Sequence, residues 1–267
     1  MSRFDLTGAS ALITGASAGI GREFARQLTG RAGSMVLVAR RRERLEELRD
    51  ELTRRDPNLN VHLREADLSD ERAVIELGEW LEREKISIDL LINNAGLGDR
   101  GAFATSETRR VKQMMAVNVV ALTRLTRLLL PPMIQQKRGA ILNVSSSAGF
   151  LPLAGLAVYA ATKAYVTSFS EAIRAESRGT GVTVTALCPG PVHTEFNEVA
   201  RRASSQRDRS GPAIAYVSVE DVVRDALDAL EHDRAIVIPG FVMKLGMFLV
   251  RLTPLSILRL ASRLSAR

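Results

Sequence analysis

Residues 10–21, with the sequence SALITGASAGIG, place a short apolar run directly before a cluster of glycines. The apolar run predicts a buried strand, and a helical pattern follows the glycines. Glycine permits a tight turn and lets the backbone approach a pyrophosphate closely. The first turn of the following helix offers free N–H groups to the same phosphate. The spacing of Gly15, Gly19 and Gly21 therefore indicates the opening of a dinucleotide-binding unit.

Apolar runs and helical patterns alternate along the rest of the chain. Further strands are predicted at residues 35–39, 60–66, 88–92, 140–144, 182–187 and 235–238. Helices are predicted at residues 20 onward, 43–55, 70–84, 106–136, 154–175 and 221–230, with Pro131 and Pro132 expected to end or kink the fourth of them. Because no linker or change of composition divides this pattern, we expect one domain over residues 1–240. Its fold class is α/β, a Rossmann-type doubly wound parallel sheet of about seven strands with helices on both faces.

Composition excludes several classes of protein. The chain has 267 residues and a net charge of +7, but aromatic residues are sparse and no nucleic-acid recognition motif is visible. The three histidines are scattered, so no metal site is expected. Cys188 is the single cysteine, which rules out an intrachain disulfide and fits a reducing, cytoplasmic compartment. The polar N-terminus does not read as a secretory signal, and the absence of an 18-residue apolar run argues against a membrane-spanning helix.

The residues after the second predicted strand bear on the choice of cofactor. An acidic residue at this point would bind ribose hydroxyls, whereas an arginine suits a 2′-phosphate. The chain has Arg40, Arg41 and Arg42 there. The pattern favours NADP(H) over NAD(H), with Arg40 on the phosphate. The alternative is that these arginines only open the charged helix at residues 43–55.

Tyr159 and Lys163 stand four residues apart in the predicted helix 154–175 and so share one face. A cation beside a phenol lowers the phenol's pKa and makes it a usable acid or base near neutral pH. The alternative is a core tyrosine beside a solvated lysine. The remaining motifs favour the first interpretation, because they follow predicted strands and should meet at one edge of the sheet. They are Gly15, Arg40, Asp67, Asn93, Ser146 and Pro189.

In these motifs the chain resembles the short-chain dehydrogenase/reductase family over residues 6–240. The carriers of the resemblance are TGASAGIG at 14–21, NNAG at 93–96, Ser146 thirteen residues before Tyr159, Tyr159-x-x-x-Lys163, and Pro189-Gly190. The resemblance implies that Tyr159 is the general acid/base, that Lys163 lowers its pKa and holds the nicotinamide ribose, and that Ser146 binds the substrate oxygen. It assigns Asn118 to a water relay. The cofactor-binding residues that it implies are Gly15, Ser17, Gly19, Ile20, Gly21, Arg40, Asp67, Leu68, Asn94, Ala95, Gly96, Tyr159, Lys163, Pro189, Gly190, Val192 and Thr194.

The expected function is NADP(H)-dependent transfer of a hydride between nicotinamide and a carbonyl or secondary alcohol of an apolar, lipid-like or ketone substrate. The alternative is a catalytically silent dinucleotide-sensing or scaffolding protein with the same fold. The intact set of Ser146, Tyr159 and Lys163 argues against that alternative. The resemblance also implies a homodimer or homotetramer through the predicted helices 106–136 and 154–175.

Two segments depart from the family's common core. Residues 195–215 lie where the family has a variable substrate lid, and they contain Arg201, Arg202, Arg207 and Arg209, which either meet an anionic group or lie in a solvated loop. Residues 241–267 form a basic tail without acids, with apolar residues at helical spacing before Pro254. Three roles stay open for this tail: it lies on an anionic membrane surface, packs on a partner subunit, or covers the substrate mouth.

Overall fold

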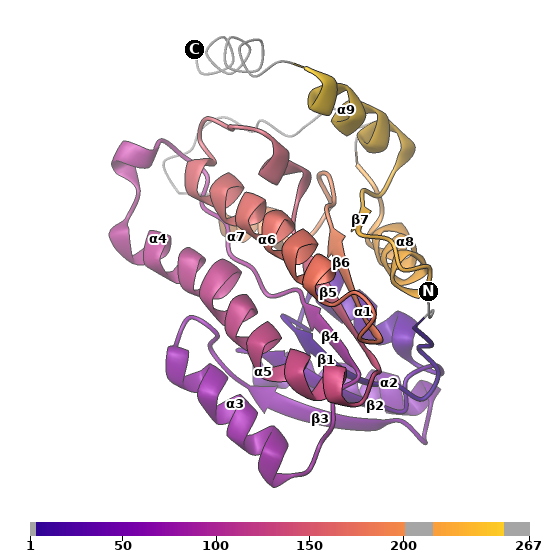
Figure 1. Cartoon of the computed structure of the whole chain (residues 1–267). Coiled ribbons are helices and arrows are strands. Elements are labelled where there is room, and N and C mark those ends of the chain that lie inside the picture. Colours follow the sequence, from indigo (N-terminus) through magenta and orange to yellow (C-terminus); the bar gives the residue numbers. More distant parts are fainter. Residues whose placement is uncertain (1–3, 201–215, 254–267) are drawn as a thin grey trace.

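The computed structural model describes residues 4–200 and 216–253, and these residues form one parallel sheet with helices on both faces (Figure 1). The sheet has seven strands in the order β3-β2-β1-β4-β5-β6-β7. The strands are β1 (Ser10–Thr14), β2 (Ser34–Ala39), β3 (Asn60–Glu65), β4 (Leu90–Asn93), β5 (Gly139–Val144), β6 (Val182–Leu187) and β7 (Ile236–Val237). The expected Rossmann-type sheet is confirmed, and strand ends differ from the sequence expectation by one or two residues.

The helices alternate with the strands. They are α1 (Gly19–Leu28), α2 (Arg42–Arg55), α3 (Glu71–Arg83), α4 (Thr108–Met115), α5 (Leu122–Gln135), α6 (Ala157–Glu176), α7 (Glu195–Ala200), α8 (Val219–Glu231) and α9 (Phe241–Leu252). Three further turns are the 3-10 helices η1 (Phe103–Thr105) and η3 (Ser147–Phe150) and the π-helical segment η2 (Ala116–Ala121).

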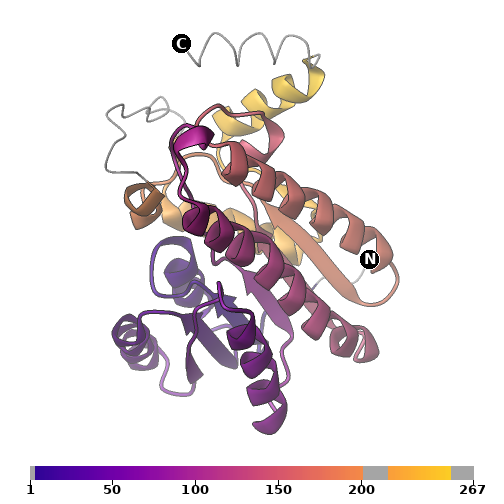
Figure 2. The same ribbon diagram turned by 90° about the vertical axis from the view of Figure 1, so that its left-hand side faces the viewer.

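Both faces of the sheet are covered, because successive side chains of each strand point in opposite directions. In β1, Ala11 and Ile13 join the buried cluster under α1, α2 and α8, while Leu12 joins the cluster under α3, η2 and α5. Every strand is paired in parallel with its neighbours. Figure 2 shows the continuous helical run α4–η2–α5 lying beside α6 over the second face.

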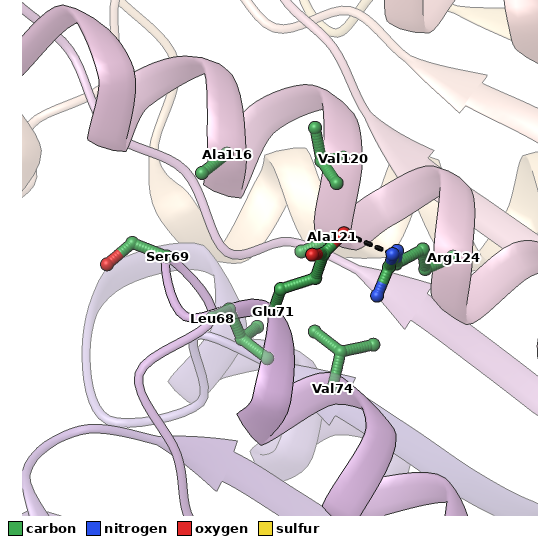
Figure 3. A pocket seen from close by; sticks show the side chains of 8 residues that line it. All are labelled: Leu68, Ser69, Glu71, Val74, Ala116, Val120, Ala121 and Arg124. Carbon is green, nitrogen blue, oxygen red and sulfur yellow. Dashed lines mark ion pairs between the residues drawn. The ribbon is translucent and has the colours of Figure 1, made fainter.

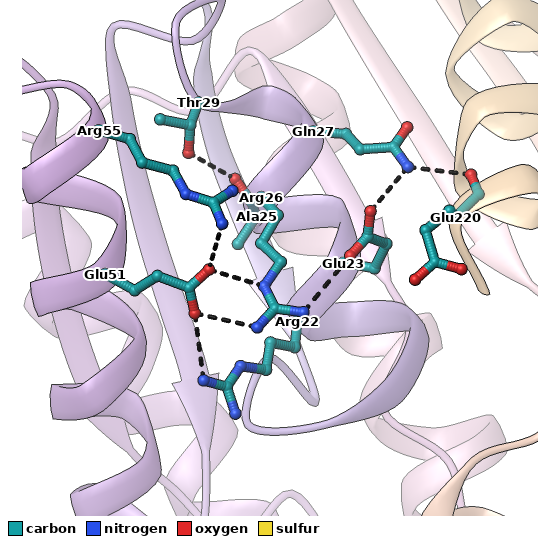
Figure 4. Close-up of polar contacts among 9 residues, drawn as sticks. All are labelled: Arg22, Glu23, Ala25, Arg26, Gln27, Thr29, Glu51, Arg55 and Glu220. Carbon is teal, nitrogen blue, oxygen red and sulfur yellow. Dashed lines mark hydrogen bonds and ion pairs between the residues drawn. The ribbon is translucent and has the colours of Figure 1, made fainter.

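A charged cluster holds α1, α2 and α8 together on the first face (Figure 4). The carboxylate of Glu51 accepts hydrogen bonds from Arg26 at 2.9 and 3.0 Å and from Arg22 at 3.2 Å, and it pairs with Arg55 at 2.9 Å. The first of these arginine contacts holds the pKa of Glu51 below its usual value. Gln27 donates to the backbone carbonyl of Glu220 at 2.9 Å, which ties α1 to α8.

The helical run α4–η2–α5 passes through both prolines that were expected to end or kink it. Pro131 and Pro132 lie inside α5, which continues to Gln135 as the predicted range 106–136 requires, so of the two expected effects the prolines do not end the helix. Proline removes a helical N–H and crowds the preceding turn. Here the last turn is held by packing, since Met133 is buried and fills the space over Gly139 at the start of β5.

The run Thr108–Gln135 is also the one stretch of the described residues long and apolar enough to cross a membrane by length and hydropathy. The sequence expectation had argued against such a stretch, because no run of 18 apolar residues is present. The structure accounts for its apolar character in another way, because Leu125, Leu129 and Met133 are buried against the sheet.

Candidate functional site

The site lies at the carboxyl edge of the sheet, between β1 and β4. In the strand order these two neighbours mark the point where the winding reverses, and open α/β sheets bind ligands in the crevice there. The glycine turn follows β1, and Asn94 follows β4. The fold therefore brings the first two sequence motifs to one place.

Thr14 and Asn94 join the two strand ends by hydrogen bonds. The Thr14 hydroxyl accepts from the backbone N–H groups of Asn94 at 2.9 Å and Ala95 at 3.0 Å, and it donates to the carbonyl of Ile92 at 3.3 Å. The Asn94 amide donates to the carbonyls of Thr14 and Gly15. The tying of neighbouring loops by an asparagine, expected from the sequence, is present.

The glycine turn is closed to side chains at two of its positions. A Cβ at Gly15 would lie 2.8 Å from the Asn94 amide nitrogen, and one at Gly21 would lie 2.4 Å from the same atom. Gly15 and Gly19 also have φ of 67° and 51°, in the left-handed region that favours glycine. The turn leads into α1, whose N-terminal N–H groups can bind an anion. These residues fit the phosphates of a dinucleotide.

Tyr159 and Lys163 project from one face of α6 toward the end of β5. Lys163 is buried and its ammonium donates to the carbonyl of Val144 at 2.7 Å, while its nitrogen lies 5.8 Å from the centre of the Tyr159 ring. Burial lowers the pKa of Lys163 to about 8, and an electrostatic interaction with Cys188 opposes that shift. The lysine is thus held beside the tyrosine, with its polar end tied to β5.

The Tyr159 residue as a whole is half-buried, but protein atoms surround its hydroxyl. Burial raises the pKa of Tyr159 above its ordinary value, and a hydrogen bond with the side chain of Ser146 works in the opposite direction. The sequence expectation that Lys163 lowers this pKa is therefore not met in this geometry. The reason is that removal of the phenolate from water outweighs the contacts that stabilise it.

Ser146 precedes η3 and accepts a hydrogen bond from the backbone N–H of Ala148 at 3.1 Å. The neighbouring Ser145 has a different task, because it is buried and bonds to the carbonyl of Lys163 and the hydroxyl of Thr167. Of these two serines, Ser146 is the one beside the phenol, as the sequence motif predicts.

Asn118 lies in η2 and is buried. Its side chain pairs with both backbone groups of Leu97, accepting from the N–H at 2.8 Å and donating to the carbonyl at 2.9 Å. It also donates to the Thr162 hydroxyl on α6 at 3.0 Å. A Cβ on Gly96 would lie 3.5 Å from both the Asn118 amide oxygen and the Lys163 nitrogen. Gly96, Asn118 and Lys163 therefore line one space.

The later loop returns to the same edge. The carbonyl of Pro189 accepts from the N–H of Ser147 at 2.9 Å. The Thr194 side chain packs against the glycine turn, because a Cβ on Gly19 would lie 3.2 Å from its methyl carbon. Val192 and Ile20 are apolar supports that pack on the core under α1 and α8. Gly190 is covered from outside by Met243 of α9, whose side chain lies 2.9 Å from where a Cβ would stand.

The residues assigned to the adenosine end are more widely spread. Arg40 is exposed. Asp67 is exposed and accepts from the N–H and hydroxyl of Ser69, which forms a turn before α3. Leu68 is buried and lines a pocket of about 260 Å³ between α3 and η2 (Figure 3). An ion pair between Glu71 and Arg124 closes one side of this pocket.

Three contacts at the site were missed by reasoning from the sequence. Arg41, the neighbour of Arg40, donates to the Ser17 hydroxyl at 3.3 Å and so lies against the glycine turn. Glu195 pairs with this same arginine at 2.9 Å. Phe196 lies over Tyr159, with ring centres 5.6 Å apart. Glu195 and Phe196 lie five and six residues after Gly190, but their partners are far away in sequence and no local pattern points to them.

Comparison with known proteins decides the family. The family model for short chain dehydrogenases matches residues 9–205. This chain belongs to the short-chain dehydrogenase family. A member of this family is an oxidoreductase, so the expectation of an enzyme of that class is confirmed.

Individual members of the family extend the comparison. The NADP-dependent 3-hydroxy acid dehydrogenase YdfG of Escherichia coli is 39% identical over 191 residues, which is 70% of this chain and 75% of that one. A short-chain dehydrogenase from Sphingobium yanoikuyae in complex with NADPH has a TM-score of 0.78 at 31% identity, covering 87% and 88% of the two chains. A bulky-bulky ketone specific alcohol dehydrogenase from Comamonas testosteroni has a TM-score of 0.76 at 31% identity, covering 87% and 86%.

Proposed function

We propose that this protein transfers a hydride between NADP(H) and a carbonyl or secondary alcohol group of an apolar substrate. The observation that carries this proposal is the grouping of Ser146, Tyr159 and Lys163 beside Gly96, next to a glycine turn that fits a dinucleotide. The bound cofactor supplies or accepts the hydride. The protein's own part is to orient the two reactants and to exchange a proton.

Each residue of the group has a task that its position supports. Tyr159 exchanges the proton with the substrate oxygen, since its phenol lies beside the side chain of Ser146. Ser146 holds that oxygen beside the phenol. Lys163 lines the space next to Gly96 and holds the nicotinamide ribose. Asn118 holds the loop after β4 by hydrogen bonds to both backbone groups of Leu97 and so keeps the neighbouring Gly96 in place.

The preference for NADP(H) is supported by two arginines, Arg41 against the Ser17 hydroxyl and the exposed Arg40 beside it. A guanidinium offers a forked pair of donors to a phosphate. Consistent with this, the E. coli relative is named as NADP-dependent and the Sphingobium structure holds NADPH.

An apolar substrate is supported by the aromatic cover of the site. The Phe196 ring lies 5.6 Å from that of Tyr159 and would also meet a Cβ on Gly98. The Comamonas relative is named for bulky ketones, whereas the E. coli relative is named for 3-hydroxy acids. NADPH oxidation measured over ketones, aldehydes, 3-oxoacyl thioesters and 3-oxo acids separates these classes, and repetition with NADH gives the cofactor preference.

Tyr159→Phe tests the mechanism. The variant should bind NADPH as the wild type does, while turnover falls by roughly 10²- to 10⁴-fold because the proton donor is gone. The matched control is Tyr165→Phe on the exposed side of the same helix, which should retain turnover. Equal rates for Tyr159→Phe and wild type would refute the mechanism. If the wild type binds NADPH but turns over none of the ketones, aldehydes, thioesters or 3-oxo acids, the result favours the alternative of a catalytically silent dinucleotide-sensing protein.

We also propose that α9 brings the protein to anionic membrane surfaces. One stripe of this helix consists of large apolar side chains that are 50–79% exposed, namely Phe241, Leu245, Phe248, Leu249 and Leu252. The opposite side, with Met243 and Met247, packs on the domain. Lys244 is exposed beside the stripe. A basic helix with such a stripe fits the interface of an anionic bilayer.

A further inference from the structure

Glu195 connects the cover of the active site to the start of α2. It is the first residue of α7, and its two carboxylate oxygens accept from different arginines, Arg41 at 2.9 Å and Arg44 at 2.5 Å. Hydrogen bonds from Arg44 and then Arg41 lower the pKa of Glu195, so it is ionised at neutral pH. All three side chains are 39–45% exposed, which leaves the arginines accessible to a ligand from solvent.

Arg41 also contacts the glycine turn through the Ser17 hydroxyl. It therefore lies between the turn that fits the pyrophosphate and the carboxylate of Glu195. A phosphate and a carboxylate require the same forked donors of a guanidinium. The Glu195 carboxylate thus occupies donors that a 2′-phosphate on the adenosine ribose would use.

We propose that Glu195 is an internal competitor for the 2′-phosphate of NADP(H), and that the phosphate releases α7 when it takes Arg41 from Glu195. This inference rests on the proposed use of NADP(H). The phosphate carries about two negative charges against one for the carboxylate, and the rest of the cofactor holds it in place. It therefore wins the competition, while NAD(H) leaves the Glu195 contacts intact.

Release of α7 matters because Phe196, which follows Glu195, covers the proposed acid/base Tyr159. Phe196 lies over Tyr159, and Ala200 at the end of α7 would meet a Cβ on Gly98. The contacts of Glu195 hold the start of this short helix against α2. Loss of the contact with Arg41 weakens this hold on the start of α7 and so eases the entry of a substrate. Glu195 is thus a specificity-determining residue for the cofactor and couples cofactor binding to access.

The coupling must be reciprocal. If the 2′-phosphate breaks the contacts of Glu195, then removal of these contacts strengthens binding of the 2′-phosphate by the same factor. Exposed ion pairs shift equilibria by about two- to fivefold. A gain of this size is expected only for ligands that carry the 2′-phosphate.

The test is calorimetric titration of the full-length, cofactor-free protein with 2′,5′-ADP and, separately, with 5′-ADP, which lacks the 2′-phosphate. Glu195→Gln should bind 2′,5′-ADP about two- to fivefold more tightly than wild type and bind 5′-ADP equally well. Glu198→Gln, which removes an exposed acid from the same helix, should bind both ligands as wild type does. An unchanged or weakened affinity of Glu195→Gln for 2′,5′-ADP would overturn the proposal.

Amide hydrogen exchange gives a second, independent readout. In the wild type, 2′,5′-ADP should speed exchange in residues 195–200 and 5′-ADP should not. In Glu195→Gln, exchange there should be fast before any ligand is added. If wild type discriminates the two ligands but exchange in α7 does not respond, the coupling is wrong while the proposed cofactor stands. If wild type binds 2′,5′-ADP no better than 5′-ADP, both proposals fail.

Discussion

Lys163 is a buried cation whose single hydrogen bond given by the structure goes to a backbone carbonyl, that of Val144. Removal of an ammonium from water costs free energy and favours its neutral form. That is why the pKa of Lys163 falls to about 8. The same burial raises the pKa of Tyr159, where the neutral form is the protonated one. Burial of the ionisable group is the first cause of both shifts.

The shift at Lys163 predicts a pH dependence of stability. An unfolded lysine titrates near pH 10.4, so between about pH 8 and 10.4 the folded protein binds fewer protons at this residue than the unfolded chain. The free energy of unfolding therefore rises with pH in this window. The penalty for burying the charge is complete below pH 8 and disappears toward pH 10.4.

Urea unfolding of the cofactor-free wild type and Lys163→Met at pH 7 and pH 9.5 measures this effect. Between pH 7 and pH 9.5, the unfolding free energy of the wild type should rise by about 1–2 kcal/mol relative to that of Lys163→Met. Lys112→Met, at an exposed lysine of α4, controls for the loss of one positive charge. A difference between wild type and Lys163→Met that is the same at both pH values would contradict the assignment.

At the scale of elements, the π-helical segment η2 sets the position of the loop after β4. A π-helical turn rotates the residues after it relative to an unbroken α-helix, and such turns are frequent at functional sites. Here it places Asn118 against both backbone groups of Leu97 and against Thr162 of α6. One side chain thus joins the β4 loop to α6, which carries Tyr159 and Lys163.

Asn118→Ala should lower the free energy of unfolding by about 1–3 kcal/mol, because the N–H and carbonyl of Leu97 lose their partner. Thr123→Ala is the matched control, since Thr123 lies in the same helical run and bonds only the Tyr165 hydroxyl near the surface. It should cost far less. Equilibrium unfolding in urea measures both. If Asn118→Ala retains full stability and loses only turnover, its role is in the water relay and not in holding the loop.

At the scale of the molecule, the packing of α9 brings its apolar stripe and the active-site loops to one end of the protein (Figure 1). Met243 covers Gly190, and the helix also contacts η3, which follows Ser146. A surface that binds α9 would therefore lie close to the mouth of the site. A lipid-soluble ketone could then enter from that surface. The oligomeric state expected from the family resemblance stays a prediction.

Phe248→Glu tests the membrane contact without disturbing the packed side of α9. The wild type should sediment with anionic liposomes, and this variant should stay in solution, because a carboxylate in the stripe is costly to bury in the bilayer interface and is repelled by anionic lipid. Truncation to residues 1–240 should act in the same way.

Ile75→Glu places the same charge on an exposed apolar residue of α3 and should leave sedimentation unchanged. Equal sedimentation of wild type, Phe248→Glu and the truncation would remove the proposal. The second part of the basic tail, with Leu255, Leu258 and Leu260, and the arginines at 201, 202, 207 and 209 lie outside the described residues.

The sequence by itself determined the alternation of strands and helices, the parallel sheet and the positions of Gly15, Asn94, Ser146, Tyr159 and Lys163. These follow from short-range periodicity and from motifs at strand ends, which local sterics and hydrogen bonding dictate. The sequence left open whether Pro131 and Pro132 end the predicted helix 106–136. Only the tertiary structure decided that α5 continues to Gln135, because the last turn is held by Met133 on β5.

Tertiary structure also decided the electrostatics and the cover of the site. Spacing along α6 places Lys163 beside Tyr159, but how much water surrounds them depends on the packing of α6 against β5 and η2, and that packing reverses the expected shift of the phenol's pKa. Glu195 meets Arg41 and Arg44 across more than 150 residues of chain. Contacts of this kind arise from folding and leave no local pattern in the sequence.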